Sequence, residues 1–391
     1  MRICLVYDCL FPHTVGGAER WYRYLAERLA ADGHEVTYLT LRQWDRGTDP
    51  GVPGVKVRAV GPRMALYAGP GRRRVLPPLV FGAGVLGHLL RHGGRYDVVH
   101  TCSFPYFSLL AAALMRPRWR YRLVVDWFEV WSRRYWREYL GRVGGDAGWL
   151  IQHLCVRVPQ HAFCFSALYA ARLREEGLAD VQTLAGAYTG SLEPHPGGRA
   201  EALVLFAGRH IPEKAVPAIP PAVARARERR PELRAAILGD GPDRARVVSL
   251  VSELGLGDAV DVPGFVAGET VQDLMARALC LLLPSRREGY GLVVIEAAAY
   301  GTPSVVVAGP DNAAVELIAP GENGFIAPSA SPEDLAEAIL RVEAAGEDLR
   351  RSTAAWFARN APRLSLAQSL EIVLGTYGHL SQELDAPPRA R

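Results

Sequence analysis

The chain has 391 residues, and at about 100–200 residues per domain this length predicts two domains, each large enough to bury its own core. Hydrophobic residues make up 49% and charged residues 22%, values that exclude a disordered, collagen-like or fibrous chain. The formal net charge of +4 hides an asymmetry, because residues 1–190 carry 25 basic and 15 acidic residues whereas residues 191–391 carry 20 and 26. The two halves therefore differ in the charges that they attract.

The sequence lacks a candidate membrane span and lacks the cysteine patterns of metal and redox sites. No apolar run reaches the roughly 18–20 residues that a membrane-spanning helix needs, and the first ten residues resemble an opening strand more than a signal peptide. The six cysteines show neither a CxxC pair nor a Cys/His metal spacing. We therefore expect a cytoplasmic protein with reduced thiols and no bound metal.

The first half begins with a strand pattern at residues 3–7, followed by a loop that contains Pro and Gly. An amphipathic helix is then predicted from Ala18 to about Ala31, ended by Gly33, with a second strand over 34–41. The order strand, glycine-containing loop, helix, strand is typical of a parallel sheet. Further buried strands are predicted over 96–100, 121–127 and 162–167.

A stretch rich in Gly and Pro, residues 185–198, interrupts this alternation and predicts a domain boundary. The alternation then resumes with strands over 203–208, 233–241, 258–265, 280–285, 303–309 and 324–328, and helices over 217–229, 271–277, 292–300, 332–345 and 364–384. We therefore predict an α/β fold of two Rossmann-like parallel-sheet domains that face a cleft. Residues 1–190 would form the first domain and residues 191–363 the second, with a C-terminal helix in 364–391 packing back toward the first domain before a loose tail.

The most informative segment is SRREGYGLVVIEAAAYGTP, which carries Glu288 and Glu296. Glu288 lies in the loop after a predicted strand, where Gly289 and Gly291 let the backbone turn sharply and approach a ligand closely. The helix that follows presents free N–H groups at its start, which suit a phosphate. Glu296 lies about one turn into that helix and can accept hydrogen bonds from hydroxyls. This pattern suits a sugar nucleotide; the alternative is a surface turn followed by an ordinary acidic helix.

Two cations follow the first strand of the second half. Arg209 and Lys214 lie in the loop GRHIPEK, and Lys214 is one of only two lysines among the 45 basic residues. Arginine binds phosphate with paired N–H groups and lysine binds it as a point charge. Loops at the carboxyl ends of parallel strands are where open α/β sheets bind ligands. No GxGxxG or P-loop motif is present, so a standard dinucleotide or NTP cradle is not predicted.

The ordered set of motifs resembles the GT-B glycosyltransferases of family 4, which are retaining sugar transferases. The resemblance spans about residues 1–345 and is most specific in the second half. It rests on GGAER at 16–20, DVVH at 97–100, AGRHIPEK at 207–214, ILGDGP at 237–242, the pair Glu288 and Glu296 eight residues apart, and GENGF at 321–325.

The resemblance implies three catalytic residues, with Arg209 and Lys214 on the donor diphosphate and Glu288 on the donor sugar hydroxyls. It also implies that Glu296 holds the ribose hydroxyls and that the main chain near Val266 meets the base. The other implied donor-binding residues are Gly16 and Gly17 at the diphosphate, Asp126 at the end of a strand, and Gly289, Tyr290, Gly291 and Leu292 beside the sugar and phosphate. Such enzymes need no metal or other cofactor, because cations and helix N-termini neutralise the leaving diphosphate.

One departure from the family leaves alternatives open. Members commonly carry a His two residues beyond the position of Asp126, where this chain has Phe128. The chain could therefore be a catalytically altered or non-enzymatic sugar-nucleotide-binding relative, or a GT-B sugar-nucleotide epimerase. A glycosidase that uses Glu288 and Glu296 as its acid and base is disfavoured, because their glycine-rich context at the start of a helix suits a phosphate. A pyridoxal phosphate enzyme needs a lysine for its Schiff base. The chain has only Lys56 and Lys214, and Lys214 is already assigned to the diphosphate.

The sequence as a whole thus predicts a metal-independent, retaining transferase. Its donor would be a nucleotide sugar such as a UDP- or GDP-sugar, and its acceptor a glycan, a lipid-linked saccharide or a small metabolite. Basic and aromatic segments at 71–75, 116–122 and 131–142 predict peripheral contact with an anionic membrane at its inner face, with solvated surface arginines as the alternative. No nucleic-acid recognition motif is present, so no nucleic-acid partner is predicted.

Overall fold

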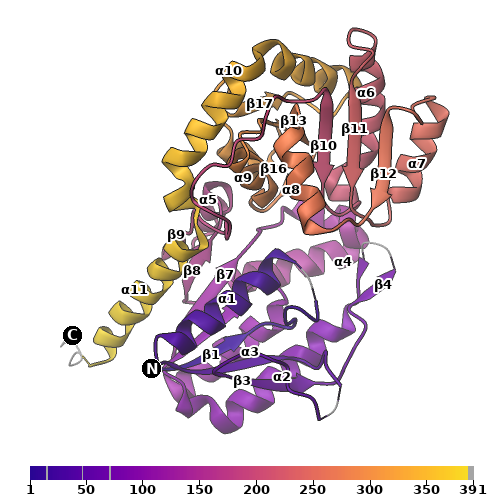
Figure 1. Cartoon of the computed structure of the whole chain (residues 1–391). Coiled ribbons are helices and arrows are strands. Elements are labelled where there is room, and N and C mark those ends of the chain that lie inside the picture. The colour runs from indigo at the N-terminus through magenta and orange to yellow at the C-terminus, as the bar shows by residue number, and fades with distance from the viewer. Residues whose placement is uncertain (15, 46, 70–71, 386–391) are drawn as a thin grey trace. The chain divides into compact units, whose positions relative to one another are not determined.

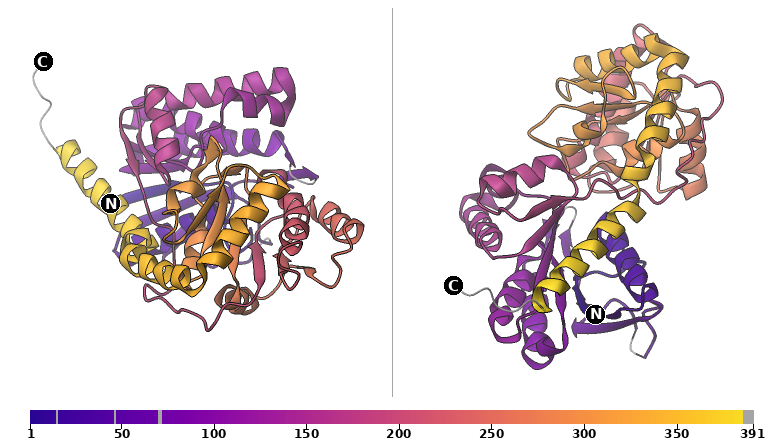
Figure 2. Two further views of the ribbon diagram at one scale, coloured as in Figure 1. Left: turned by 90° about the horizontal axis from the view of Figure 1, so that it is seen from above. Right: turned by 90° about the vertical axis from the view of Figure 1, so that its left-hand side faces the viewer.

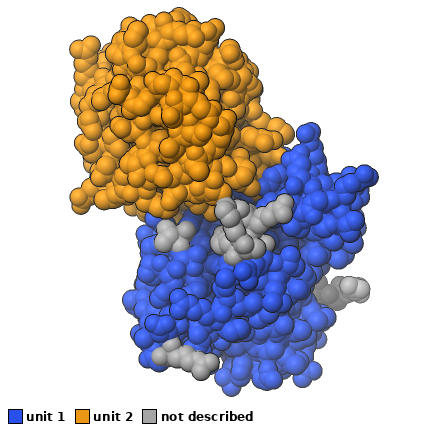
Figure 3. Space-filling model, turned by 90° about the vertical axis from the view of Figure 1, so that its right-hand side faces the viewer, with its two compact units in different colours: residues 1–68, 73–185, 367–391 blue, residues 69–72, 186–366 orange. Residues whose placement is uncertain are grey.

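The computed structural model describes residues 1–14, 16–45, 47–69 and 72–385. Contacts within the chain divide it into two compact units (Figure 3), a first unit of residues 1–68, 73–185 and 367–391 and a second unit of residues 69–72 and 186–366. The boundaries predicted from the sequence are at 190 and 363. Gly71 of the predicted basic segment 71–75 lies outside the described residues. The predicted loose tail, 385–391, begins at the last residue of α11, and the rest of it, 386–391, also lies outside the described residues.

A seven-stranded parallel sheet forms the centre of the first unit, in the order β3-β2-β1-β6-β7-β8-β9 (Figure 1). Its strands are β1 (Arg2–Val6), β2 (Glu35–Leu41), β3 (Val55–Gly61), β6 (Val98–Cys102), β7 (Arg122–Trp127), β8 (His161–Cys164) and β9 (Val181–Thr183). The central strands are almost entirely buried, which is expected of a parallel sheet with helices on both faces. The strand order reverses between β1 and β6.

The helices of the first unit are α1 (Gly17–Ala31), α2 (Leu76–His92), α3 (Tyr106–Trp119), α4 (Arg133–Val156), α5 (Ala167–Glu175) and most of α11 (Leu366–Asp385), with a 3-10 turn at Gly93–Arg95. Right-handed crossovers place α2 to α5 on one face of the sheet and α1 on the other. The C-terminal helix α11 lies on the face of α1, because Glu371 forms an ion pair with Arg28 of α1 (Figures 1 and 2).

The second unit has its own six-stranded parallel sheet, in the order β12-β11-β10-β13-β15-β17. Its strands are β10 (Leu203–Ala207), β11 (Arg234–Leu238), β12 (Val260–Gly264), β13 (Cys280–Leu283), β15 (Ser304–Val307) and β17 (Gly324–Ala327). Its helices are α6 (Ile219–Arg227), α7 (Arg244–Glu253), α8 (Gly268–Arg277), α9 (Leu292–Ala299) and α10 (Pro332–Leu364), with 3-10 turns η2 (Pro212–Lys214), η3 (Val216–Ala218) and η4 (Ala313–Leu317). Two short pairs complete the structure: β14 (Arg287–Glu288) with β16 (Asp311–Asn312), and β4 (Tyr67–Gly69) with β5 (Arg72–Arg73).

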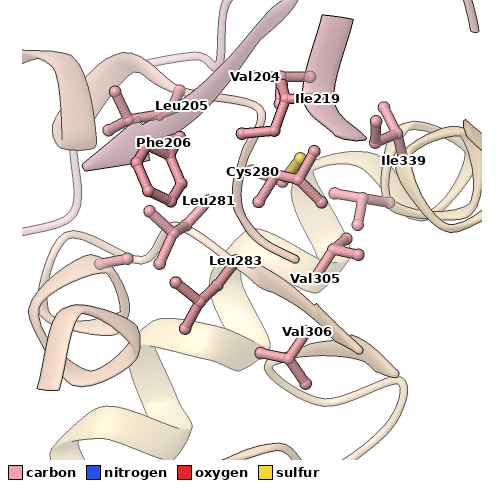
Figure 4. Close-up of a cluster of buried hydrophobic side chains, with 14 of the residues drawn as sticks. Val204, Leu205, Phe206, Ile219, Cys280, Leu281, Leu283, Val305, Val306 and Ile339 are labelled. Carbon is pink, nitrogen blue, oxygen red and sulfur yellow. The ribbon is translucent and has the colours of Figure 1, made fainter. Parts of the chain in front are cut away.

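The core of the second unit forms where the apolar strands meet the covering helices. Figure 4 shows Phe206 of β10 next to Leu281 of β13, and Ile219 of α6 next to Val204 of β10. These four side chains and Ile339 of α10 belong to one cluster and are fully buried. Because β10 and β13 lie at the centre of the sheet, this packing fixes the two strands whose following loops carry the predicted cations and Glu288.

The predicted fold of two parallel-sheet α/β domains is confirmed, and every predicted strand is present. No helix is predicted from the sequence at α2, α3, α4, α5 or α7, and no strand is predicted at β3 or β9. Helices α2 and α3 are apolar over most of their length and include Gly or Pro, so they lack the alternation of polar and apolar residues that marks a surface helix. Helix α10 continues past the predicted end at 345 to Leu364, bending at Gly346, whose φ is +55°.

Candidate functional site

The strand order of the second unit reverses between β10 and β13 (Figure 1). Open α/β sheets bind ligands outside the carboxyl ends of their strands at such a reversal, because the flanking loops diverge there. The loop after β10 carries Arg209 and Lys214, and the loop after β13 carries Glu288. The three side chains predicted to be catalytic therefore come from the two loops that flank one reversal point.

Two of these side chains meet directly. Nζ of Lys214, the last residue of η2, forms an ion pair with Oε2 of Glu288, the last residue of β14. The backbone N–H of Arg286 donates to the carbonyl of Glu213 at 2.9 Å and so ties the two loops together beside the pair. The side chains are 19% and 12% exposed, so solvent reaches the pair and a ligand can reach both groups.

Arg209 lies on the same loop but outside this pair. Its side chain is exposed, and its guanidinium makes no hydrogen bond or ion pair with any residue that the structure describes. A solvated cation five residues before Lys214 is available to an anion, although the structure shows no contact between Arg209 and the ion pair.

The residue after Arg209 has a role that the sequence analysis does not predict. His210 is fully buried. Its backbone N–H donates to the carbonyl of Asp240, and its backbone carbonyl accepts from the N–H of Asp243, both at 2.9 Å. A Cβ at Gly241 would lie 2.4 Å from the His210 carbonyl oxygen, so this turn requires glycine. His210 therefore anchors the cation-bearing loop to the turn after β11, and burial lowers the pKa of its imidazole.

The glycines after Glu288 allow a sharp entry into α9. Gly291 has φ of +97°, and a Cβ there would lie 2.8 Å from Cβ of Ala314, so only glycine fits. Gly289, Tyr290 and Leu292 are half-buried around this turn. The first N–H groups of a helix have no partner within it and can bind an anion, so the turn presents donors beside the ion pair.

Glu296 lies one turn into α9 and is half-buried. Burial, with smaller contributions from Tyr300 and the nearby Glu296 carboxylate, raises the pKa of Tyr188 to about 12. Burial and, to a smaller extent, the same carboxylate raise the pKa of Tyr300. Glu296 therefore lies close to two tyrosines that stay protonated, in a polar setting where it can accept hydrogen bonds.

The turn after β12 carries Val266 and a neighbouring aromatic residue, Phe265, for whose side chain the sequence predicts no role. Phe265 is 78% exposed, whereas Val266 is half-buried. Two hydrogen bonds of 2.8 Å fix the turn. The backbone N–H of Gly239 donates to the carbonyl of Gly264, and the guanidinium of Arg244 donates to the carbonyl of Val262. An exposed aromatic ring on a rigid turn at the carboxyl end of a strand is a stacking surface, and the signal for it was the aromatic residue after Pro-Gly.

In the first unit, Gly16 and Gly17 start helix α1. Gly16 is the extended residue before the helix, and a Cβ there would lie 2.3 Å from a side-chain oxygen of Glu19. A Cβ at Gly17 would meet no atom within 4 Å. The backbone at Gly17 is therefore uncovered, and its predicted contact with a diphosphate stays a prediction.

Asp126 lies in the core of the first unit, which differs from its predicted contact with a donor. Its Oδ2 accepts from Nε1 of Trp21 at 2.7 Å, and its Oδ1 lies 2.9 Å from Nε2 of His100. The other nitrogen of His100 is hydrogen-bonded to the hydroxyl of Tyr377 in α11. Asp126 and His100 are both fully buried, so this carboxylate links α1, β6, β7 and α11 and has no surface to offer a ligand.

Phe128, at the place where family members commonly carry His, is half-buried just beyond β7. Its ring stacks on Phe165 with a centroid distance of 5.0 Å and an interplanar angle of 12°. Phe165 in turn packs edge-on against Trp21. An apolar aromatic pair therefore occupies this position, and it can pack against a ligand but cannot donate a hydrogen bond to one.

Groups for metal or thiol chemistry are not gathered at either sheet. Among the described residues, no three His, Cys, Asp or Glu side chains are arranged to hold a metal ion. All six cysteines are buried, and burial raises the pKa of Cys280 to about 12. The predicted ligand groups of the second unit are therefore cations, glutamates and glycine backbone, joined by the exposed ring of Phe265.

Comparison with known proteins agrees with this division of the chain. The model of glycosyltransferase family 4 matches residues 15–184, and the model of glycosyl transferases group 1 matches residues 195–356. A D-inositol 3-phosphate glycosyltransferase from Actinosynnema mirum is 30% identical over 359 residues, which cover 83% of this chain and 82% of that protein.

Solved structures show the same fold at lower identity. Sucrose-phosphate synthase from Thermosynechococcus elongatus matches with a TM-score of 0.77 at 20% identity, over 98% of this chain and 99% of that chain. Anabaena HepE, solved in complex with UDP and glucose, matches with a TM-score of 0.69 at 18% identity, over 97% of this chain and 99% of that chain. The two family matches, the relative that aligns over most of both chains and the two parallel sheets together show that this chain is a glycosyltransferase and belongs to the GT-B glycosyltransferases of family 4.

Proposed function

We propose that this glycosyltransferase takes its sugar from a nucleotide-sugar donor and transfers it to an acceptor hydroxyl with retention of anomeric configuration, without a metal or other cofactor. The observation that carries the proposal is the solvent-accessible Lys214–Glu288 pair at the strand reversal of the second unit, with Arg209 exposed on the same loop. Cations beside a carboxylate suit a ligand that presents phosphate next to hydroxyl groups.

The ion pair gives each partner a role in donor binding. A diphosphate that engages Lys214 replaces Glu288 as the counter-charge of the ammonium group. The released carboxylate then accepts hydrogen bonds from the hydroxyls of the sugar that is attached to the same diphosphate. Arg209 adds a second cation, and the backbone from Gly289 to Leu292 adds N–H donors at the start of α9.

The nucleoside half of the donor would lie along α9 and the turn after β12. Glu296 would accept hydrogen bonds from the ribose hydroxyls, and the main chain at Val266 would meet the base. The exposed ring of Phe265 would stack on that base. HepE was solved with UDP and glucose, which supports this donor class without specifying the nucleotide or the sugar for this chain.

In the proposed reaction, the bond between the anomeric carbon and the diphosphate breaks while the acceptor oxygen bonds to the same face of that carbon. The departing phosphate oxygen takes the proton of the acceptor hydroxyl. Lys214 and Arg209 stabilise the charge that develops on the diphosphate, which is their main contribution to rate. Because Glu288 is paired with Lys214, we assign it to positioning the sugar and not to nucleophilic attack.

The aromatic pair Phe128 and Phe165 is the observation that favours a second candidate function. Without a hydrogen-bond donor at position 128, the chain could bind a sugar nucleotide and transfer its sugar with altered chemistry, or bind it without transferring the sugar at all. An epimerase built on the same donor site is the remaining alternative.

The acceptor in this proposal is a glycan, a lipid-linked saccharide or a small metabolite. The proposal also includes peripheral contact with an anionic membrane through the first unit, supported by the excess of 25 basic over 15 acidic residues in 1–190. Such contact would bring the enzyme to a lipid-linked acceptor.

The test is donor turnover across a panel of UDP-, GDP- and dTDP-sugars, with water or added acceptors. We expect release of the nucleoside diphosphate from at least one donor, unchanged by excess EDTA, and a product of retained configuration by NMR. Loss of turnover in EDTA that magnesium restores would contradict the metal-independent proposal, and an inverted product would contradict retention.

A Phe265→Trp variant separates binding from transfer. Stacking on a base should quench the added indole fluorescence, so a nucleotide that quenches without turnover would identify the binding relative. If no nucleotide quenches the fluorescence of this variant and the unaltered enzyme turns over no donor, the nucleotide-sugar assignment is contradicted.

A further inference from the structure

Exposed apolar side chains are concentrated on one part of the first unit. Of the fourteen large apolar residues that are exposed in the described chain, nine lie on α2, α3 or α4 or at the residue before α2. These nine are Val75, Leu76, Leu79, Leu90, Leu114, Leu140, Val143, Leu150 and Leu154. Single exposed apolar residues are common on protein surfaces, but a cluster of them on neighbouring helices indicates an interaction surface.

On α4 these residues form a row along one face of the helix. Gly141 interrupts the helical backbone, and the regular segment after it carries Val143, Ala147, Leu150 and Leu154, all exposed. At 3.6 residues per turn, the spacing of four, seven and eleven residues keeps the four side chains within an arc of about 60°. Val143 is 86% exposed and Leu150 52%, so this row faces solvent and does not serve the core.

Helix α2 repeats the same spacing. Leu79, Ala83, Leu86 and Leu90 follow one another at four, seven and eleven residues; Leu86 is half-buried and the other three are exposed. Helix α3 packs against both α2 and α4 and presents Leu114, which is 62% exposed. Because the three helices cover the same face of the sheet, their outward rows lie on one surface of the first unit.

The same three helices carry positive charge without free acids. Helices α2 and α3 contain no Asp or Glu. The two acids of α4 are both neutralised: Glu138 pairs with Arg134 at 3.0 Å, and Asp146 pairs with Arg133 at 2.7 Å and Arg137 at 2.8 Å. Exposed Arg142 and Arg157 stand at the two ends of the apolar row on α4.

We propose that the outer faces of α2, α3 and α4, called here the α2–α4 surface, dock onto a lipid bilayer that contains anionic lipids. Apolar rows on helices that lie in the plane of the surface, bordered by arginines, fit the interface between headgroups and acyl chains. The arginines attract anionic headgroups. A second copy of this chain fits poorly, since it would bring like charges face to face. In the described residues no helix is both long and apolar enough to cross a membrane.

This inference rests on the membrane contact in the proposed function and names the surface that makes it; it does not depend on the donor chemistry. The test is sedimentation of the full chain with vesicles of phosphatidylglycerol and phosphatidylcholine in equal parts, compared with phosphatidylcholine alone. We expect at least tenfold tighter binding to the anionic vesicles, reversed at an ionic strength of about 1 M, where the Debye length falls to about 3 Å.

Two sets of variants assign the binding to the surface. The triple variant V143S, L150S, L154S should bind anionic vesicles at least tenfold more weakly, and R142Q with R157Q should lose about fivefold for each arginine. The matched control is V248S with L254S, which removes two apolar residues of the second unit that are 44% and 41% exposed. The control should bind within twofold of the unaltered chain.

A fluorescence change on membrane binding tests the same surface without relying on a loss of binding, which a misfolded variant would also show. All six native cysteines are buried, so a thiol introduced by Val143→Cys can be labelled selectively with an environment-sensitive NBD dye. We expect a blue shift and a rise in emission when anionic vesicles are added. The same dye at Val248→Cys should not respond.

Four outcomes would overturn the inference. The unaltered chain could fail to bind anionic vesicles at low salt, the triple variant could bind as well as the unaltered chain, or the dye could respond equally at 143 and 248. The fourth is a dimer of the unaltered chain that the triple variant dissolves, with no vesicle binding by either. Donor turnover is measured separately without vesicles, so failure of the proposed transfer reaction would be seen independently of failure to dock.

Discussion

The two units share one architecture, a parallel sheet whose strand order reverses once, yet they differ in what their polar side chains do. In the second unit Lys214 and Glu288 meet in a pair that solvent reaches, 19% and 12% exposed. In the first unit His100 and Asp126, from neighbouring strands, meet in a pair that is fully buried. The same combination of a basic and an acidic side chain therefore forms an accessible site in one sheet and an internal brace in the other.

The covering helices produce the difference. Trp21 of α1 donates to Asp126, and Tyr377 of α11 bonds to His100, so two helices close over the pair in the first unit. In the second unit the pair lies on a short 3-10 turn and a two-residue strand, which leave it open. A charged residue near the end of a parallel strand is thus a ligand group only where no helix covers it.

The largest effect that would test this contrast concerns stability. Asp126→Ala should lower the free energy of unfolding by about 3–5 kcal/mol, because His100 and Trp21 would lose their buried partner. Urea unfolding followed by circular dichroism measures it. The matched control is Asp97→Ala, which removes a partly exposed ion pair with Arg2 and should cost less than about 1 kcal/mol. An Asp126→Ala protein of full stability with weakened donor binding would make Asp126 a ligand group after all.

The corresponding test in the second unit concerns catalysis. Lys214→Ala or Arg209→Ala should lower kcat/KM by roughly 100-fold or more, about 2.7 kcal/mol, which is the scale of losing one group that stabilises transition-state charge. Lys214→Arg should restore little, because a planar fork does not replace a point charge at a close contact. Steady-state kinetics against the donor measures the effect.

The fold should survive these changes, since neither side chain is part of the core. Arg246→Ala, which removes an exposed arginine of α7 that is paired with Glu253, should leave kcat/KM unchanged. Turnover near that of the unaltered enzyme in a folded Lys214→Ala protein would mean that this loop does not hold the phosphates.

A smaller effect would sharpen the assignment of α9. Glu296→Ala should raise the donor KM or Kd by an amount equivalent to about 1–3 kcal/mol, because the ribose hydroxyls would lose an acceptor. Titration with the nucleoside diphosphate alone separates this effect from sugar recognition. A donor affinity within twofold of the unaltered enzyme would remove Glu296 from the ribose site.

The smallest expected effect concerns pH and His210. Burial lowers the pKa of His210 in the folded chain, so the unfolded chain takes up the proton first as the pH falls. The stability that His210 contributes is present above the unfolded pKa of about 6.5 and declines below it, by at most about 1.4 kcal/mol per pH unit. Comparing urea midpoints at pH 7.5 and 5.5, we expect a smaller loss in His210→Phe than in the unaltered chain. An equal loss in both would show that His210 takes no part.

Much of the fold follows from the sequence pattern. Each buried strand of the second sheet is an apolar run bounded by turn residues, and the glycines at 289 and 291 mark a tight turn into a helix. The positions of Arg209, Lys214 and Glu288 after β10 and β13 follow from that pattern and the ligand-binding rule for parallel sheets. Helices α2 and α3 escaped prediction because they carry apolar residues on their exposed faces as well as on their buried faces, and so lack the polar face that marks a surface helix.

What the sequence alone determined was which residues follow which strands, because strands, turns and caps depend on residues close together in the chain. Exposure was decided only by the tertiary structure, since it depends on which distant segment covers a side chain. Tyr377 reaches His100 across 277 residues of sequence and helps to bury Asp126, whereas the Lys214 side chain stays 19% exposed and Phe265 stays 78% exposed. The local sequence around Asp126 contains no sign of that covering helix, and so a residue predicted to bind the donor proved to hold the first unit together.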